Sequence, residues 1–446
     1  MVKPVPSLGT INGLASTTLP APGESEPSID ITALSYGPYG IGRLNGKAIM
    51  IPHTAPGDRI VARVVDSQKH YAIGAMVRII HPSALRQTPP CPYVGRCGGC
   101  SWQHLLYETQ LRAKQQSVED ALRRIGKLDD FEIRPIIAAL DPYRYRRRIR
   151  LQVTDAKRLG LYAAASHDLV EIDSCAIADD HLNSTIAPLR RWLAAINSAI
   201  EYLEIIVGDG PDELVVVARI HSRLDPGDKP SCSGLIDGRD LIRGLIVLEP
   251  HERKTWGEPW ITVKLTDALT VTLDADVFTQ VNAAGNRQMI SELLALADFR
   301  VDDQVLELYS GAGNFTLPMA TRVEKIVAVE GHRQAVANGK LNAQKYRLDN
   351  IDWQCAAVPQ AVARLKRQRR RFSKIVLDPP RAGAKGVTGE LASLGAETIC
   401  YLSCNPTTMA RDLAALAARG YKLRLVQPID LFPHTFHVES LAVMIQ

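Results

Sequence analysis

The 446-residue sequence has no run of about eighteen apolar residues, and its mean hydropathy of -0.06 is that of a soluble chain. A helix that spans a bilayer needs about 20 consecutive apolar residues, so the sequence predicts no membrane span. The first 28 residues lack the apolar segment of a secretory signal, and we expect a flexible tail there. These absences exclude membrane-embedded and secreted classes and predict a cytoplasmic protein.

Cysteine is scarce, and neither sign of charge dominates. Eight cysteines in 446 residues cannot form a disulfide scaffold, so free thiols or metal ligands are expected. Lys and Arg number 53 against 48 Asp and Glu, and the net charge of +5 excludes a histone-like polycation while it permits local basic patches. The length suggests roughly two to four domains.

Turn signals and periodicity divide the chain into a tail and three further parts. We predict a tail at 1–28, a small barrel at 29–88, a middle α+β domain at 89–282 and an α/β domain at 283–446.

The first of these parts contains short β-branched runs separated by turn signals such as Asn45-Gly46 and Gly57-Asp58. Five short strands in so little chain predict a closed, OB-like barrel, and the Pro-rich stretch at 88–92 ends it. Beyond it, apolar residues repeat at helical spacing over 102–125, and Gly126 lies where a helix stop is expected.

The last part alternates short apolar runs with helical segments. Its first helix is expected at 286–299, and its strands at 304–309, 325–330, 352–356, 374–378 and 398–402. This alternation is typical of a doubly wound parallel sheet. Two more apolar runs, 421–432 and 437–444, have only a short loop between them and should pair antiparallel. Together these strands outline a class I, Rossmann-like methyltransferase domain.

The first strand of this sheet leads into a glycine loop, LELYSGAGNF at 306–315. Gly311 and Gly313 allow a tight turn and close approach of a ligand, and Glu330 ends the next strand where ribose hydroxyls could be bound. An ordinary tight turn is the alternative for Gly-x-Gly alone. Thr316 replaces the third small residue of dinucleotide sites, and no P-loop occurs. S-adenosylmethionine, which has no pyrophosphate, fits better.

Two motifs follow neighbouring strands at the carboxyl edge, LDPPR at 377–381 and YLSCNP at 401–406. Ligands bind at that edge of open α/β sheets, so Asp378 and Cys404 should face the same crevice. A buried structural thiol is the alternative for Cys404 and the preferred interpretation of Cys400. A third motif, FPHTFHVES at 432–440, offers a weak zinc pattern, and we interpret Glu439 as a proton acceptor near the cysteine.

A second group of cysteines lies earlier in the chain. Cys91, Cys97 and Cys100 form C-x5-C-x2-C, and a closed site needs a fourth ligand, either Cys175 or Cys232. The spacing differs from the C-x3-C-x2-C radical-enzyme motif and from the paired C-x2-C of zinc ribbons.

The segment YRYRRRIR at 143–150 interleaves Tyr with five Arg. On a strand, Arg146, Arg148 and Arg150 would share one face. The interleaving favours RNA phosphate contact and base stacking over a solvated face, and Arg147 is included in this RNA-binding set. For RLKRQRRR at 364–371 the two interpretations are equally good.

In this order, FTQVN (278–282), LELYSGAGNF, LDPPR, YLSCNP and FPHTFHVE resemble the RNA uracil-5-methyltransferase family, and the motif order is most similar to its 23S rRNA branch. The resemblance extends from about residue 29 to the end. Glu307 and Ser310 stand where many members have Asp and Cys. The barrel resembles a TRAM domain, particularly in PYGIGRLNGKAIMIPHTAPGDRI. The basic segment and the barrel mark the partner as a folded RNA, and the resemblance makes 23S rRNA the most direct candidate. No membrane and no obligate protein partner are expected.

The resemblance also implies the roles of individual residues. Cys404 would add to carbon 6 of uracil, since carbon 5 is a poor nucleophile, and Glu439 would remove the carbon-5 proton. Arg381 stands where amine methyltransferases have an aromatic residue, which favours uracil over adenine. S-adenosyl-L-methionine would be bound by Gln280, Tyr309, Gly311, Gly313, Asn314, Glu330 and Asp378. A 4Fe–4S cluster would be held by Cys91, Cys97, Cys100 and Cys175.

Two alternatives stay open. The first is a tRNA uracil-5-methyltransferase, although bacterial enzymes of that type lack the barrel and the cysteine cluster. The second is an iron–sulfur RNA-binding protein with an idle catalytic domain, against which stands the joint presence of Cys404, Glu439 and Asp378.

Overall fold

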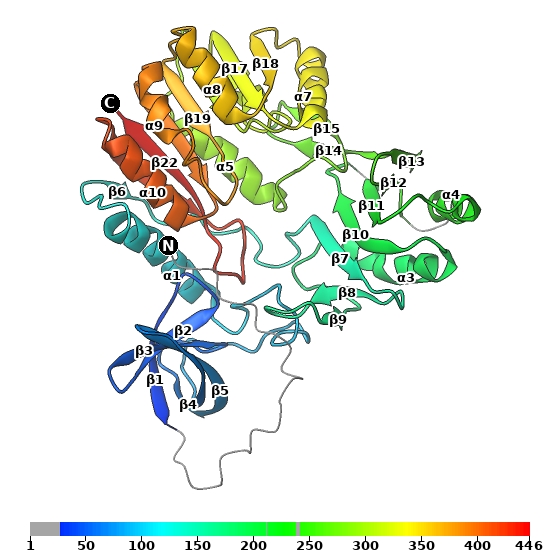
Figure 1. Ribbon diagram of the computed structural model, residues 1–446, viewed down its shortest axis with the longest axis vertical. Coiled ribbons are helices and arrows are strands. Elements are labelled where there is room, and N and C mark those ends of the chain that lie inside the picture. The colour runs from blue at the N-terminus through cyan, green and yellow to red at the C-terminus, as the bar shows by residue number, and fades with distance from the viewer. Residues whose placement is uncertain (1–26, 211, 238–240) are drawn as a thin grey trace.

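The computed structural model describes residues 27–210, 212–237 and 241–446 (Figure 1). The predicted tail at 1–28 therefore lies outside the described residues except for its last two positions, and Ser28 already begins the first strand. Within the described part of the chain, no helix is long and apolar enough to cross a membrane.

The N-terminal strands close into the predicted barrel, in the order β1-β2-β3-β5-β4. They are β1 Ser28–Leu34, β2 Tyr39–Leu44, β3 Lys47–Pro52, β4 Arg59–Ser67 and β5 Tyr71–His81. Alternate residues such as Ile49 and Ile51 point inward and are fully buried. Asn45 and Gly46 both have positive φ (50° and 79°), which suits the tight turn between β2 and β3.

Helix α1 (Tyr107–Arg124) follows the barrel and is capped by Ile125, next to the expected stop at Gly126. The helix begins five residues later than the pattern over 102–125 predicts. Trp102 and Leu105 are apolar at helical spacing because they pack in turns against Ala55 of the barrel. Apolar spacing alone cannot separate such turns from a helix.

The middle of the chain forms a seven-stranded sheet in the order β13-β12-β11-β10-β7-β8-β9. Its strands are β7 Arg148–Val153, β8 Leu159–Tyr162, β9 Leu169–Glu171, β10 Ile200–Val207, β11 Leu214–Ile220, β12 Gly244–Leu248 and β13 Arg253–Gly257. The helical segments alongside are α2 Asp180–Ser184, α3 Ile186–Ala195, η1 Pro226–Asp228 and α4 Lys229–Asp237. Trp192 of α3 and Cys232 of α4 join the apolar core of this sheet. The mixed pairing confirms the predicted α+β character.

The C-terminal sheet has the order β18-β17-β16-β19-β20-β22-β21-β6. Its strands are β16 Gln304–Leu308, β17 Lys325–Glu330, β18 Ile351–Cys355, β19 Lys374–Leu377, β20 Thr398–Ser403, β21 Lys422–Ile429 and β22 Glu439–Ile445, with β6 Glu132–Ile133 at the edge. Strands β16 to β20 pair in parallel, and β22 lies antiparallel between β20 and β21. Five parallel strands followed by an antiparallel pair are the arrangement predicted for a class I methyltransferase domain.

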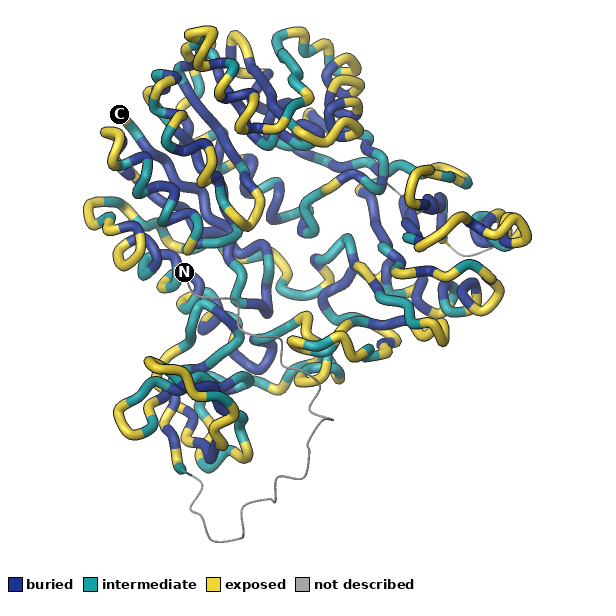
Figure 2. The backbone as a smooth tube through the Cα atoms, viewed as in Figure 1, coloured by how far each residue is buried: buried dark blue, intermediate teal, exposed yellow. Residues whose placement is uncertain are grey.

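Helices cover both faces of this sheet, so its central strands are buried from both sides (Figure 2). They are α5 Ala283–Leu296, α6 Thr316–Ala320, α7 Arg333–Lys345, α8 Val358–Arg367, α9 Thr388–Leu391 with η2 Ala392–Leu394, and α10 Pro406–Ala417. The prediction of 286–299 for the first helix was wrong by three residues. The helix starts earlier because Asn282 caps it, accepting the Gly285 N–H at 2.9 Å.

Segments predicted in the middle domain contribute to this C-terminal core. The hairpin of β14 (Trp260–Lys264) and β15 (Thr270–Asp274) packs against α7. There the side-chain amide of Asn342 accepts a hydrogen bond from the Thr272 N–H and donates one to the Thr272 carbonyl oxygen. Strand β6 pairs with β21, which no sequence pattern indicated. The domain boundaries at 28, 88 and 282 stay predictions.

Candidate active site

The three loops singled out in the sequence meet at one edge of the C-terminal sheet. Strands β16, β19 and β20 are parallel neighbours, so their carboxyl ends lie side by side. The glycine loop follows β16, LDPPR follows β19 and YLSCNP follows β20. This is the edge where open α/β sheets bind ligands.

The glycine loop makes a tight turn over the edge of the sheet. Tyr309, Gly311 and Gly313 all have positive φ, of 62°, 55° and 96°. A Cβ on Gly313 would lie 3.0 Å from the Trp353 ring, so only glycine packs there without displacement. The Gly311 N–H donates to Glu330 Oε2 at 3.0 Å. The Glu330 carboxylate is thereby fixed at the mouth of the loop, as a ribose acceptor requires.

Asn314 belongs to the same loop, and Gln280 lies two residues before the cap of α5. The side-chain amide of Asn314 pairs reciprocally with that of Asn286 in α5, at 2.8 and 2.9 Å. Gln280 is half-buried just before the α5 cap at Asn282. Asn314 thus ties the glycine loop to α5, and cofactor contacts by Asn314 and Gln280 stay predictions.

Two carboxyl groups belong to neighbouring strand ends: Glu307 in β16 is buried, and Asp378, directly after β19, is half-buried. Burial raises the pKa of Glu307 to about 8 and that of Asp378 to about 7. The Thr316 hydroxyl donates to Glu307, which works against this rise. Buried acids at a binding site are ionised most easily beside a positive charge. The site therefore suits a cationic ligand, such as the sulfonium of S-adenosylmethionine, better than an anionic nucleotide.

Cys404 lies between the end of β20 and the start of α10. Asn405 caps the helix by accepting the Thr407 N–H at 3.0 Å, and Pro406 is its first residue. Asn405 and Pro406 therefore form a capped helix start directly after Cys404. Burial and the nearby Glu439 raise the pKa of the Cys404 thiol to about 11, and Arg381 opposes them by its charge and a hydrogen bond.

Glu439 is the first residue of β22 and is 4% exposed. Burial and then the charge of Asp378 raise its pKa well above the ordinary value, against the effect of Arg381. Among the described residues, its Oε1 atom has no hydrogen-bond partner. The structure thus brings Cys404, Asp378 and Glu439 together, and it leaves one buried carboxyl oxygen directed at no other protein group.

Sequence reasoning missed two residues at this site. The sequence interpretation of Arg381 was only that it replaces the aromatic residue of amine methyltransferases. In the structure its guanidinium faces the Cys404 thiol. Tyr36, in the barrel turn between β1 and β2, donates its hydroxyl to the Cys404 carbonyl oxygen at 3.2 Å. No signal in the sequence joins two residues 368 positions apart.

The loop at 430–438, which leads to Glu439, is tied to α1. Buried Lys114 donates to Asp430 Oδ1 at 2.6 Å, and Gln110 accepts the His434 N–H at 2.8 Å. Burial lowers the pKa of both His434 and His437 to about 4, so both are neutral at physiological pH. In the described ranges, no three His, Cys, Asp or Glu side chains have metal-binding geometry, neither in this loop nor among Cys91, Cys97, Cys100 and Cys175.

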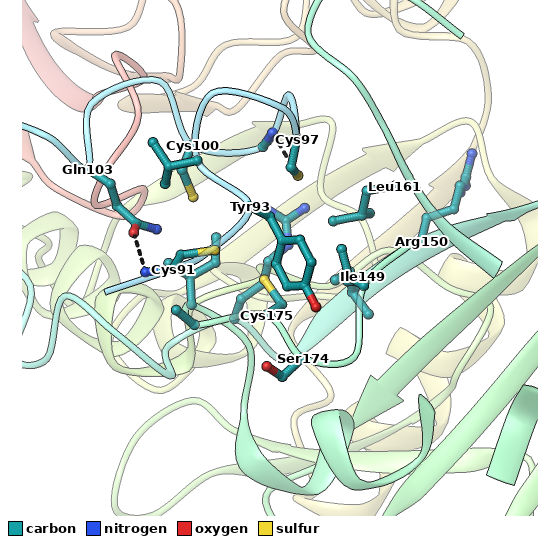
Figure 3. Close-up of a pocket in the computed structure, with 16 residues that line it drawn as sticks. Cys91, Tyr93, Cys97, Cys100, Gln103, Ile149, Arg150, Leu161, Ser174 and Cys175 are labelled. Atoms are coloured by element: carbon teal, nitrogen blue, oxygen red, sulfur yellow. Dashed lines mark hydrogen bonds between the residues drawn. The ribbon is translucent and has the colours of Figure 1, made fainter. Parts of the chain in front are cut away.

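The four predicted cluster cysteines line one cavity of about 160 Å³ (Figure 3). Cys91, Cys97 and Cys100 come from the loop before α1, and Cys175 approaches from beyond β9. Apolar residues such as Ile149 and Ile172 complete the cavity wall. Cys232, the other candidate ligand, is buried in α4 away from this cavity. The structure thus brings the four thiols to one cavity, and the 4Fe–4S cluster stays a prediction.

The arginines at 146–150 have partners within the protein. Arg147 contacts Asp209 at 2.6 Å and Arg148 contacts Glu204 at 2.8 Å. Arg150 shares that face of β7, lies over the Tyr202 ring at 4.1 Å and keeps half its side chain exposed. Arg146 precedes the strand and, like Arg150, lines the cysteine cavity. In the second basic segment, Lys366 pairs with Glu390. RNA contacts by all these residues stay predictions.

Comparisons with known proteins agree with this architecture. The family model described as tRNA (Uracil-5-)-methyltransferase matches residues 106–446, and the TRAM domain model matches residues 25–77. The 23S rRNA (uracil(1939)-C(5))-methyltransferase RlmD of Enterobacter sp. (strain 638) is 34% identical over 429 residues, covering 93% of this chain and 96% of that protein. The protein of the same name from Edwardsiella ictaluri is 35% identical over 423 residues, covering 93% and 94%.

Among solved structures, the tRNA (uracil-54, C5)-methyltransferase of Pyrococcus abyssi in complex with S-adenosyl-L-homocysteine superposes with a TM-score of 0.72. The match covers 94% of this chain and 100% of that one, at 22% sequence identity. At this identity the match establishes the shared fold.

Proposed function

The chain belongs to the RNA uracil-5-methyltransferase family, and from that premise we propose that it methylates carbon 5 of one uridine in 23S rRNA through a covalent cysteine–uracil adduct. As a member of this family it is an enzyme that uses S-adenosylmethionine to modify RNA. The RNA, the uridine and the adduct are the proposed elements. The single observation that carries the adduct is the convergence of Cys404, Arg381 and Glu439 at the carboxyl edge of the sheet.

Cys404 is the proposed nucleophile. Its thiolate adds to carbon 6 of uracil, which makes carbon 5 an enolate carbon able to take the electrophilic methyl group of S-adenosylmethionine. Arg381 favours the thiolate by its charge and hydrogen bond, although burial keeps the Cys404 pKa high in the free protein. A target uridine inside a helix must leave its stack to reach this buried thiol.

Glu439 is the proposed base. After methylation, carbon 5 carries both a methyl group and a proton, and loss of that proton lets the Cys404 sulfur leave carbon 6. The raised pKa of Glu439 makes its carboxylate a stronger acceptor once ionised, and its free Oε1 leaves room for the substrate proton. His437 is the less suitable base because its pKa is lowered to about 4.

We assign the methyl donor to the glycine-loop side of the same edge. Glu330 would accept the ribose hydroxyls, and Tyr309, Gly311 and Gly313 would shape the turn around the nucleoside. Asp378 would lie between donor and target, where its buried carboxyl can face a positive charge. Gln280 and Asn314 complete the proposed contacts at the α5 side of the loop.

We also propose that Cys91, Cys97, Cys100 and Cys175 hold a 4Fe–4S cluster, supported by the cavity that all four line. Such a cluster would tie the loop before α1 to the middle sheet, since uracil methylation transfers no electron. Arg150, exposed beside Tyr202, is the best placed of the four arginines to contact RNA phosphate. The barrel would supply a second RNA surface.

The assignment to 23S rRNA rests on the two relatives named for that substrate, each at least 34% identical across 93% of this chain. Methylation of tRNA is the alternative, and mass mapping separates them. RNA from cells with and without the gene should differ by one 5-methyluridine in 23S rRNA, which the gene restores and its Cys404→Ala form does not. A 5-methyluridine lost from tRNA, with 23S rRNA unchanged, would contradict the proposal.

A further inference from the structure

One side chain of the barrel reaches the active site. The Tyr36 hydroxyl donates to the Cys404 carbonyl oxygen at 3.2 Å. The same phenol is close enough to Cys404, Arg381 and Glu439 for their charges to act on it, and burial raises its pKa far above the ordinary value. Tyr36 is therefore a neutral donor inside the group of side chains that surrounds the thiol.

The Tyr36 ring is held by the catalytic loop itself. It packs edge-on against Phe436 with ring centroids 5.5 Å apart, and Phe436 in turn lies 4.2 Å from the His437 ring. Phe436 and Leu34 of the barrel pack against the same small core of Ala55, Trp102 and Leu105. The position of the phenol is thus fixed by contacts between the barrel and the loop that leads to Glu439.

The hydrogen bond from Tyr36 reaches a peptide group of Cys404 that lies outside regular secondary structure. Strand β20 ends at Ser403, and α10 begins after its cap at Asn405, whose carbonyl is the acceptor for Met409. The Cys404 carbonyl therefore belongs neither to the strand ladder nor to the helix. The bond from Tyr36 fixes this peptide, and with it the direction in which the Cys404 side chain leaves the backbone.

We propose that Tyr36 is a positioning residue for the nucleophile, through which the barrel sets the orientation of Cys404 for attack on uracil. The inference rests on the proposed role of Cys404. It gives the barrel a part in the chemical step as well as in holding RNA. A misdirected thiol would slow addition to carbon 6 without changing how tightly the RNA binds.

The test is the rate of covalent trapping by RNA that carries 5-fluorouridine at the target, at saturating RNA and S-adenosylmethionine. Tyr36→Phe keeps the ring against Phe436 and removes only the donor, so trapping should slow about three- to tenfold, the effect of one neutral hydrogen bond. The dissociation constant for RNA and the midpoint of thermal unfolding should match wild type. Tyr36→Ala, which also removes the ring, should slow trapping further.

Tyr39→Phe is the matched control, because Tyr39 begins β2 three residues after Tyr36 and pairs with Pro52 of β3. It should trap RNA at the wild-type rate. Wild-type trapping by Tyr36→Phe would overturn the inference. So would a weaker RNA affinity with an unchanged saturating rate, because Tyr36 would then be an RNA contact. Trapping by Cys404→Ala would instead refute the proposed function, so the two failures are distinguishable.

Discussion

Lys114 Nζ lies 2.6 Å from Asp430 Oδ1, and neither side chain is exposed to solvent. The Tyr107 hydroxyl donates to the other oxygen of Asp430 at 2.9 Å, and Lys114 also donates to the Phe432 carbonyl at 2.9 Å. This network joins α1 to the loop that carries His434 and leads to Glu439. The loop is therefore held from outside the methyltransferase sheet.

Removing one partner of this buried pair should be costly, because the other charge stays buried without compensation. Lys114→Met should lower the free energy of unfolding in urea by about 3–5 kcal/mol. Arg124→Ala, which removes an exposed pair with Asp120 on the same helix, should change it little. Equal effects of the two substitutions would show that the buried pair does not anchor the loop.

The reactivity of Cys404 should depend on pH and on Arg381. Because the thiol pKa is about 11, its alkylation by iodoacetamide in the free protein should rise about tenfold per pH unit between pH 7 and 10. Arg381→Gln removes the group that lowers this pKa, so alkylation at pH 8 should slow, whereas Arg381→Lys should keep part of the rate. Peptide mapping follows the Cys404 peptide. A rate that levels off near pH 7 would mean that the thiol is already ionised there.

Glu439→Gln should separate addition from release. Cys404 can still add and the methyl group can still transfer, but the carbon-5 proton stays and sulfur cannot leave. A denaturation-resistant complex with both the methyl label and the RNA should accumulate. Glu397→Gln, an exposed carboxyl at the far end of β20, should turn over normally. Rapid release of methylated RNA by Glu439→Gln would mean that another group, such as His437, is the base.

The cysteine cavity should contain iron. Protein purified without oxygen should carry about four irons and four sulfides per chain. Cys175→Ser should lose most of this iron, whereas Cys355→Ser, at an exposed thiol in β18, should retain it. Stoichiometric zinc without labile sulfide would contradict the cluster, and so would equal iron contents in the two variants.

Where apolar periodicity and turn chemistry are local, the sequence predicts the structure closely. Strand β17 matches 325–330 at both ends, and the barrel and the antiparallel end of the C-terminal sheet were expected. Buried parallel strands form short apolar runs between helices, and the antiparallel strands are marked by the turns and short loops that join them.

The arrangement around the thiol could not be predicted in the same way. The contact of Tyr36 with Cys404 and the pairing of Lys114 with Asp430 join residues more than 300 positions apart, with no local pattern. The partners of Arg147 and Arg148 were likewise hidden, since a basic run shows charge and not the acids that face it. The order of the motifs predicted where the site lies, whereas tertiary packing determines which charged groups surround the thiol.

The most direct test of the account is to locate the covalent bond. RNA with 5-fluorouridine at the target should trap the enzyme in the presence of S-adenosylmethionine, because fluorine cannot leave carbon 5 as a cation. Digestion and mass spectrometry should find the methylated nucleotide on the peptide that contains Cys404, and Cys404→Ala should form no adduct while it still binds S-adenosylmethionine. An adduct on any other residue, or normal methylation of uridine by Cys404→Ala, would contradict the assignment of Cys404 as the nucleophile.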